Sequence, residues 1–246
     1  MEWFADDELW RGLYPYMFPV ERMALAGQQV EQVLALGDPD GRAVLDLCCG
    51  PGRHSVEFAL QGYEVTGVDR SPFLLERARA RADEAGVSIE WIHEDMRAFR
   101  RPAAYDLACS IFTSFGYFED QEDDLRVLRN VVESLRDGGV FVIDVIGKER
   151  MARFWENSRC TGFADGTLLL MRPSVRADWC RVDNAWTLIS KDGSHRTFHF
   201  DHTIYSGREL KDLLARAGFG QVRLFGSLAG APYDLHAERL VAVARK

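Results

Sequence analysis

The sequence predicts an α/β protein built on a doubly wound, mostly parallel sheet of seven strands. Three observations predict this class: short apolar runs alternate with helical segments, acids follow the first runs, and the last two runs have no helix between them. Strands that are joined through helices run parallel, and right-handed crossovers then leave little freedom in their order. The last strand is expected to run antiparallel, and a helical N-terminal lid and an antiparallel β insertion complete the prediction.

Composition limits the classes of function. The chain has 246 residues, of which 47% are hydrophobic and 28% are charged, as in a soluble domain with one elaboration. Its formal net charge of -8 argues against a nucleic-acid partner. No run approaches the roughly 18 apolar residues that span a bilayer, and the first residues are acidic. We therefore expect a cytoplasmic protein without a membrane partner, as a monomer or homodimer.

The five cysteines indicate neither a disulfide framework nor a metal site. Their number is odd, and no CxxC pair occurs among them. We expect small, mostly buried thiols and no metal.

Residues 1–36 are expected to form a mostly helical lid or cap. Val30, Val33 and Leu34 follow helical spacing before a turn signal at residues 37–41. The aromatic stretch 9–19 contains two prolines and is not expected to be one regular helix. Two alternatives stay open for it: packing on the domain surface, or a lid that closes over a ligand with hydroxyls from Tyr14 and Tyr16.

The stretch 44–54 predicts a strand, a ligand-binding loop and a helix start. An apolar run contains Asp46 and leads into Cys48, Cys49 and a glycine turn, after which helical spacing begins. Glycines allow the backbone to approach a ligand closely. The start of a helix offers unpaired N–H groups.

Four more strands are expected before residue 147. They cover residues 62–69, 88–92, 105–111 and 140–145, with a helix from Ser71 to about residue 85 and another after the acidic stretch 119–124. Asp46, Asp69 and Asp95 then fall at the carboxyl ends of the first three strands. Ligands of such sheets bind outside these ends.

From residue 148 the pattern changes to alternating polar and apolar residues. Segments 167–175, 180–190 and 195–205 predict an antiparallel insertion of two or three strands over residues 148–203, which would cover the acceptor site. A helix from Ser206 to Gly218 and strands 221–225 and 239–244 follow. Residues 37–147 and 204–246 would together form the cofactor-binding domain.

The glycine loop alone is a weak match to a dinucleotide fingerprint. Pro51 removes a backbone donor where a pyrophosphate needs one, and Asp46 places an acid beside the loop. A cofactor with a cationic amino group and no phosphates would tolerate that acid.

Five motifs in order resemble those of class I S-adenosylmethionine-dependent methyltransferases. They lie at residues 44–54, 68–71, 94–97, 111–117 and 135–140. The resemblance is closest to the small-molecule branch, which includes aminosugar N,N-dimethyltransferases and glycine N-methyltransferase-like enzymes. It implies a Rossmann-like sheet and S-adenosylmethionine as cofactor. Cys48 departs from the pattern, since many relatives have glycine there.

The resemblance also implies residue roles. Asp69 would accept hydrogen bonds from both ribose hydroxyls, unless it only caps a helix. Asp95, with the Met96 backbone, would meet the adenine amino group, unless it is only a solvated turn acid. The loop 46–52 would hold the methionine moiety, and Arg53, if not a surface arginine, or Tyr14 would reach the methionine carboxylate. The expected cofactor-binding residues are Tyr14, Asp46, Cys48, Gly50, Gly52, Arg53, Asp69, Arg70, Glu94, Asp95, Met96, Ser110, Ile111 and Phe112.

The expected function is methyl transfer to a small-molecule acceptor, to nitrogen rather than oxygen, by in-line displacement. Tyr16, Phe115 and Tyr117 are candidate acceptor contacts. Strand alternation in residues 198–205 makes His202 the candidate base, with a surface histidine as the alternative. An NAD(P)-dependent oxidoreductase and a non-catalytic S-adenosylmethionine-binding module are the alternative functions.

Overall fold

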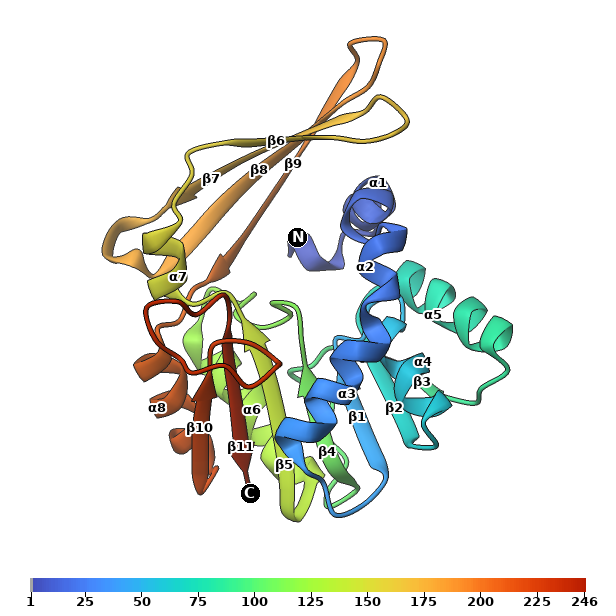
Figure 1. The fold of residues 1–246 in the computed structure, drawn as a ribbon, viewed down its shortest axis with the longest axis vertical. Coiled ribbons are helices and arrows are strands. Elements are labelled where there is room, and N and C mark those ends of the chain that lie inside the picture. The colour runs from blue at the N-terminus through green and yellow to red at the C-terminus, as the bar shows by residue number, and fades with distance from the viewer. Residues whose placement is uncertain (1) are drawn as a thin grey trace.

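The computed structural model describes residues 2–246 and contains two sheets (Figure 1). The larger sheet has seven strands: β1 (Ala43–Leu47), β2 (Glu64–Asp69), β3 (Glu90–His93), β4 (Tyr105–Ser110), β5 (Leu135–Val145), β10 (Gln221–Phe225) and β11 (Leu240–Arg245). Their order is β10-β11-β5-β4-β1-β2-β3. β11 alone runs antiparallel to its neighbours β5 and β10, and the other pairs are parallel. The predicted fold class is confirmed.

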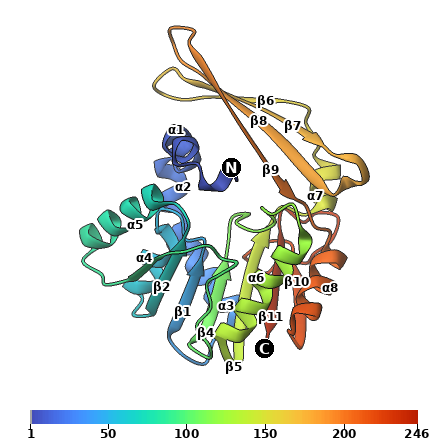
Figure 2. The same cartoon turned by 180° about the vertical axis from the view of Figure 1, so that it is seen from behind.

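Helices cover both faces of this sheet. α3 (Ala26–Gly37), α4 (Arg53–Leu60) and α5 (Pro72–Ala85) form one layer (Figure 1), and α6 (Gln121–Ser134) and α8 (Gly207–Ala217) form the other, seen from behind in Figure 2. β5 serves both layers: Val140 and Val142 join the apolar cluster under α3 and α4, whereas Phe141 and Ile143 join the cluster with α6 and α8. Burial on both faces explains the uninterrupted apolar run in this strand.

Serine side chains begin two of these helices, as the sequence predicts. Ser71 Oγ accepts a hydrogen bond from the Leu74 N–H at the start of α5. Ser206 and Glu209 form a capping box at the start of α8. Each cap satisfies backbone donors that have no partner within the helix.

The N-terminal segment consists of η1 (Trp3–Ala5), α1 (Asp7–Met17) and α2 (Val20–Ala24). The expectation that the stretch 9–19 is not one regular helix is confirmed, since α1 ends at Met17, but Pro15 lies inside α1 and does not break it. Pro15 sits in the last turn of that helix, so only one late hydrogen bond is lost there. Pro19 does separate two helices, as the residue before α2.

The insertion contains α7 (Lys148–Arg153) and a sheet of four strands: β6 (Arg159–Gly162), β7 (Leu168–Val175), β8 (Arg181–Ile189) and β9 (His195–Thr203), with η2 (Ala177–Trp179) between β7 and β8. The expectation of two or three strands is therefore wrong. β6 was missed because its residues are mostly exposed at the edge of the sheet and lack alternating apolar side chains.

The lid and the insertion contact each other above the large sheet (Figure 1). Trp3 Nε1 donates to the Asp201 carbonyl at 2.9 Å, and the Tyr16 hydroxyl donates to Thr167 Oγ1 at 3.3 Å. Gly12 in α1 lies so close to Phe198 that an added Cβ would stand 2.4 Å from the ring. Within residues 2–246, none of the helices combines the length and the apolar character needed to cross a membrane.

Candidate active site

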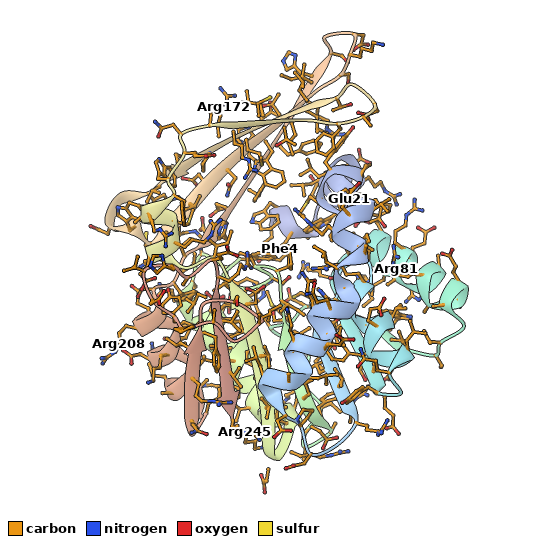
Figure 3. The ribbon with its side chains drawn as sticks, in the orientation of Figure 1. Phe4, Glu21, Arg81, Arg172, Arg208 and Arg245 are labelled. Atoms are coloured by element: carbon orange, nitrogen blue, oxygen red, sulfur yellow. The ribbon has the colours of Figure 1, made fainter. Side chains whose placement is uncertain are left out.

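A cavity lies above the carboxyl ends of β1, β2 and β4, beneath α1 and α2. Figure 3 labels one of its lining residues, Phe4 of the lid, above the strand ends. The lid contributes Phe4, Trp10, Met17, Phe18 and Arg22 to the lining. The strand ends and following loops contribute Asp46, Cys48, Cys49, Gly50, Pro51, Arg53, His54, Val68, Asp69, Arg70, Leu74, Glu94, Asp95, Met96, Ile111, Phe112, Ser114, Tyr117 and Phe118.

Asp69 at the end of β2 organises the glycine loop. Its carboxylate accepts hydrogen bonds from the Gly50 N–H at 2.8 Å and from the Ser71 N–H at 2.9 Å. Burial raises the pKa of Asp69 to about 6, although these backbone donors oppose the shift. At neutral pH the group is therefore a half-buried carboxylate with acceptor capacity left.

Asp46 lies deeper, on β1. It accepts a hydrogen bond from Ser55 Oγ at 2.5 Å, and burial raises its pKa. Within residues 2–246, no arginine or lysine forms an ion pair with it.

The loop between β1 and α4 requires a left-handed backbone. Gly50 and Gly52 have φ of 56° and 71°. A Cβ on Gly52 would also lie 2.7 Å from Trp91 and 2.8 Å from Ala78, so this glycine permits close packing as well. Cys48 adopts φ of 60° despite its side chain, and its Sγ lies 3.4 Å from Met96 Sδ.

Asp95 is held by two arginines. Arg97 donates to it at 2.7 and 3.0 Å, and Arg70 forms a second ion pair. Burial opposes ionisation, but the Arg97 hydrogen bonds and the two positive charges outweigh it and lower the pKa of Asp95. Glu2 of the lid pairs with the same arginines, at 2.8 Å from Arg97 and 3.5 Å from Arg70. The lid is thus tied to this side of the cavity.

Arg53 is a buried cation of the site and not a surface arginine, since it is only 5% exposed. Its Nη1 donates to Gln29 Oε1 of α3 at 2.5 Å, while its buried Nη2 has no hydrogen-bond partner among the described residues. The same Gln29 oxygen lies 2.8 Å from His54 Nε2. Burial lowers the pKa of Arg53 to about 10, which leaves it charged at neutral pH. An unpaired guanidinium N–H in a cavity fits an anionic ligand group.

The loop after β4 closes the cavity on the side of β5. Phe112 and Thr113 both have positive φ, and their N–H groups donate to Asp144, to Oδ2 at 3.1 Å and to the carbonyl at 2.9 Å. Phe112 is 38% exposed and forms the rim of the cavity. The Tyr117 hydroxyl donates to the Thr113 carbonyl at 2.9 Å, which folds its ring into the cavity wall.

Most residues that the sequence predicts for cofactor binding meet in this cavity. They are Asp46, Cys48, Gly50, Arg53, Asp69, Arg70, Glu94, Asp95, Met96, Ile111 and Phe112, together with the expected acceptor contact Tyr117. Three predicted cofactor residues lie outside the lining. Tyr14 packs on Phe18 and Phe73, Gly52 lies under Trp91, and Ser110 is buried in β4.

The remaining predicted residues also lie elsewhere. Tyr16 contacts the insertion, as described above, and Phe115 is buried against Tyr205, with ring centroids 5.8 Å apart. His202 on β9 does not line the cavity. Its Nε2 is buried without a hydrogen-bond partner in the described chain, and burial lowers its pKa to about 4. At neutral pH it is a neutral, weakly basic imidazole.

Sequence reasoning missed the lid residues of the lining and the group of Gln29 and His54. Aromatic density pointed to the lid as a whole, but no local pattern indicates which of its side chains turn toward the sheet. His54 follows the glycine loop directly, and this adjacency was the one available signal.

Comparisons with known proteins agree with this geometry. A methyltransferase domain model matches residues 44–139. The dTDP-3-amino-3,4,6-trideoxy-alpha-D-glucopyranose N,N-dimethyltransferase of Streptomyces venezuelae is 31% identical over 197 residues, which cover 78% of this chain and 81% of that protein. The chain belongs to the class I S-adenosylmethionine-dependent methyltransferases.

Other relatives of this methyltransferase agree. The cypemycin N-terminal methyltransferase of a Streptomyces species is 26% identical over 208 residues, 83% of each chain. The structure of the CcbJ methyltransferase from Streptomyces caelestis superimposes with a TM-score of 0.79 and 20% identity, covering 90% of this chain and 89% of that one. S-adenosylmethionine-bound CalS10, described as an amino pentose methyltransferase from Micromonospora echinaspora, covers 96% of each chain with a TM-score of 0.73 and 20% identity.

This methyltransferase is an enzyme that uses S-adenosylmethionine. The chain's own residues fit that cofactor: Asp69 with its carboxylate, Gly50 with its close backbone approach and Arg53, whose buried Nη2 has no hydrogen-bond partner among the described residues, all line one cavity. None of the relatives named above supports an oxidoreductase or a non-catalytic module.

Proposed function

We propose that this methyltransferase transfers a methyl group from S-adenosylmethionine to the nitrogen of a small-molecule amine, by in-line displacement. The observation that carries the proposal is the cavity in which Asp69, Gly50 and Arg53 meet beneath the lid. The names of two relatives support nitrogen as the acceptor atom, since they describe an N-terminal methyltransferase and an aminosugar N,N-dimethyltransferase.

The chemistry of each side chain supports a division of roles. Asp69 has two acceptor oxygens for the ribose hydroxyls, and Asp95 with the Met96 backbone would meet the adenine amino group, with Glu94 and Arg70 beside them in the lining. Arg53 Nη2 would pair with the methionine carboxylate. Asp46 would favour the methionine ammonium. Cys48, Gly50, Ile111 and Phe112 would complete the walls.

Positioning and exclusion of water account for the catalysis. The bound cofactor supplies an electrophilic methyl group on a sulfonium. The protein's part is to hold a neutral amine in line with that methyl group, a contribution that depends on geometry. Tyr117 and Ser114 offer polar atoms to the acceptor, and the aromatic lid residues exclude water. His202 stays a predicted base, and a base with a lowered pKa contributes little to amine deprotonation.

We further propose that residues 1–36 and 148–203 enclose the acceptor, with Tyr16 and Phe115 acting through packing around it. The contacts between Tyr16 and Thr167 and between Trp3 and Asp201 support this enclosure. A cytoplasmic location, with no nucleic-acid partner and a monomeric or homodimeric state, completes the proposal. Light scattering of the purified chain tests the oligomeric state.

Calorimetry and a turnover assay test the proposed function. S-adenosylhomocysteine should bind and NADH should not, and a panel of small amines with S-adenosylmethionine should yield S-adenosylhomocysteine. Gly50→Ala should weaken S-adenosylhomocysteine binding because it strains the cofactor loop. Gly193→Ala is the matched control, since Gly193 also has positive φ but lies in the β8–β9 turn with open space around it. Equal effects of the two variants, or turnover with oxygen acceptors only, would contradict the proposal.

A further inference from the structure

Three guanidinium groups surround the ring of Phe112 at the rim of the cavity. Their central carbons lie 4.4 Å from the ring centroid for Arg53, 5.3 Å for Arg239 and 5.5 Å for Arg22. They come from α4, from the residue before β11 and from α2, so the tertiary fold alone brings them together. The arrangement is unexpected in a chain with a net charge of -8.

Carboxylates only partly balance these charges. Arg239 pairs with Asp144 at 2.6 Å. Within residues 2–246, neither Arg22 nor Arg53 forms an ion pair: Arg22 Nη1 donates to the Met17 carbonyl at 2.5 Å, and Arg53 donates to Gln29 and to the Arg22 carbonyl. Asp46 and Asp144 act on Arg53 only through space.

The positive region continues beyond the ring. Arg150 of α7 has a buried Nε without a hydrogen-bond partner among the described residues. Burial and the charge of Arg239 lower the pKa of Arg150, and burial and Arg239 likewise lower the pKa of Arg22. Neighbouring cations that repel one another are a cost to the fold, and a bound anion offsets such a cost.

We propose that this arginine rim, formed by Arg22 and Arg239 around Phe112 with Arg150 near Arg239, binds an anionic group of the acceptor, a carboxylate or a phosphate. The inference rests on the proposed function, because it concerns the acceptor of the same reaction. The cofactor has one carboxylate, and the buried Nη2 of Arg53 suffices for it. Arg22 also lines the cavity and is left for a second anion. Guanidinium groups bind carboxylates and phosphates through paired N–H donors.

The rim would act on both ends of such an acceptor. Its positive charge attracts the anionic group and orients the molecule at the mouth of the cavity. The same charge disfavours the ammonium form of the acceptor amine, and so lowers the pKa of that amine. The neutral amine is the form that attacks the methyl group, so the rim favours the reactive species without a protein base.

Calorimetry on the full chain saturated with S-adenosylhomocysteine tests this site. Inorganic phosphate and acetate are titrated separately at constant ionic strength, so that the two arms distinguish a phosphate from a carboxylate preference. We expect at least one of them to bind at millimolar concentration. Arg22→Gln should weaken that binding by about tenfold or more, the factor expected for losing one charge-assisted hydrogen bond. Arg172→Gln, at an exposed position on β7, should leave it unchanged.

The outcomes separate this site from the cofactor site. S-adenosylhomocysteine affinity within about twofold of the wild type shows that Arg22→Gln is folded; if that variant does not fold, Arg22→Lys, which keeps the charge and loses the planar fork, replaces it. Binding of neither anion, equal binding by the Arg22 variants, or competition between the anion and S-adenosylhomocysteine would overturn the rim site. Failure of S-adenosylhomocysteine itself to bind would instead overturn the proposed function, and this inference with it.

Discussion

Asp69 combines burial with a task that requires a negative charge. Burial raises its pKa to about 6, so the carboxylate is ionised at neutral pH and protonated in mild acid. The ribose hydroxyls need an acceptor, and protonation converts one oxygen of the carboxyl group into a donor. Affinity for the cofactor should therefore depend on this one titration.

We predict that S-adenosylhomocysteine affinity falls as the pH drops below about 6. The group's pKa is raised in the free protein, so below it the binding-competent carboxylate becomes the minor form, and the dissociation constant should approach a tenfold rise for each pH unit. Calorimetry between pH 5 and 8 measures this. Asp69→Asn should bind weakly with a flat profile, whereas Asp137→Asn, at an exposed position near the start of β5, should keep the wild-type profile. A flat wild-type profile would disprove the assignment.

Cys48 carries backbone strain at the start of the cofactor loop. A residue with a Cβ at φ of 60° is disfavoured, and branching at Cβ makes it worse. Cys48→Val should therefore lower the free energy of unfolding by about 1–3 kcal/mol. Cys48→Gly should be tolerated, because relief of strain offsets the lost contact with Met96. Urea denaturation of the two variants measures their free energies of unfolding. Equal stability of the valine variant and the wild type would contradict the strain argument.

Local patterns revealed the residues of the glycine loop and of the strand ends, because their positions follow from the chain's own periodicity. Arg22 and Gln29 could not be found in this way. Their neighbours Phe112 and Arg53 are distant in the chain, and only tertiary packing joins them. His202 shows the same limit: alternation assigned it to a face of β9, but did not reveal what packs on that face.

At the scale of elements, one buried arginine fastens the insertion to the loop after β4. Arg181 begins β8, and its guanidinium donates to Asp201 at 2.5 and 2.8 Å and to Thr203 Oγ1 at 2.8 Å. It also donates to the carbonyls of Tyr117 and Phe118, which line the cavity. A single side chain thus connects two strands of the insertion to the wall of the site.

Arg181→Met should destabilise the protein by about 3 kcal/mol or more, because it removes the charged donor from the Tyr117 and Phe118 carbonyls and leaves Asp201 paired with the more exposed Arg176 alone. Arg181→Lys should lower the free energy of unfolding by less, because it keeps the positive charge. It should still be less stable than the wild type, because one ammonium group cannot reach all four acceptors. Arg196→Met, at a side chain that is 55% exposed on β9, should change stability little. Urea denaturation compares the three variants, and a small effect at Arg181 would show that the insertion is held mainly by other contacts.

Elements with strong caps or long apolar runs were predictable, whereas an edge strand was not. The helices that begin after Ser71 and Ser206 could be predicted from these two capping residues. β6 carries neither an apolar face nor a turn signal of its own, and it exists because β7 offers a free edge. Pro15 misled the prediction because a proline removes its own N–H donor from the helix but leaves later donors in place, and α1 continues past it to Met17.

At the scale of the whole molecule, composition conceals the distribution of charge. The net charge of -8 correctly describes the chain as acidic, yet arginines from α2, from α4 and from the residue before β11 meet around Phe112, and Arg150 of α7 lies near one of them. Net charge informs solubility and long-range attraction, whereas binding depends on the local field. The lid is a second example. The sequence left open whether the stretch 9–19 packs on the domain surface or closes over a ligand, and only the tertiary structure places α1 and α2 over the cavity.

Gly12 of the lid packs against Phe198 of the insertion without room for a side chain, and this contact offers a test of whether their closure retains the cofactor. Gly12→Ala should favour the helix itself by about 1 kcal/mol, yet its Cβ would stand 2.4 Å from the Phe198 ring and push α1 away from β9. We expect S-adenosylhomocysteine to dissociate several-fold faster from this variant in stopped-flow measurements, although Gly12 does not line the cavity. Gly27→Ala is the matched control, since that helical glycine faces only the flexible carboxylate of Glu57. Unchanged dissociation from Gly12→Ala would mean that the lid holds the cofactor through its own aromatic residues, independently of the insertion.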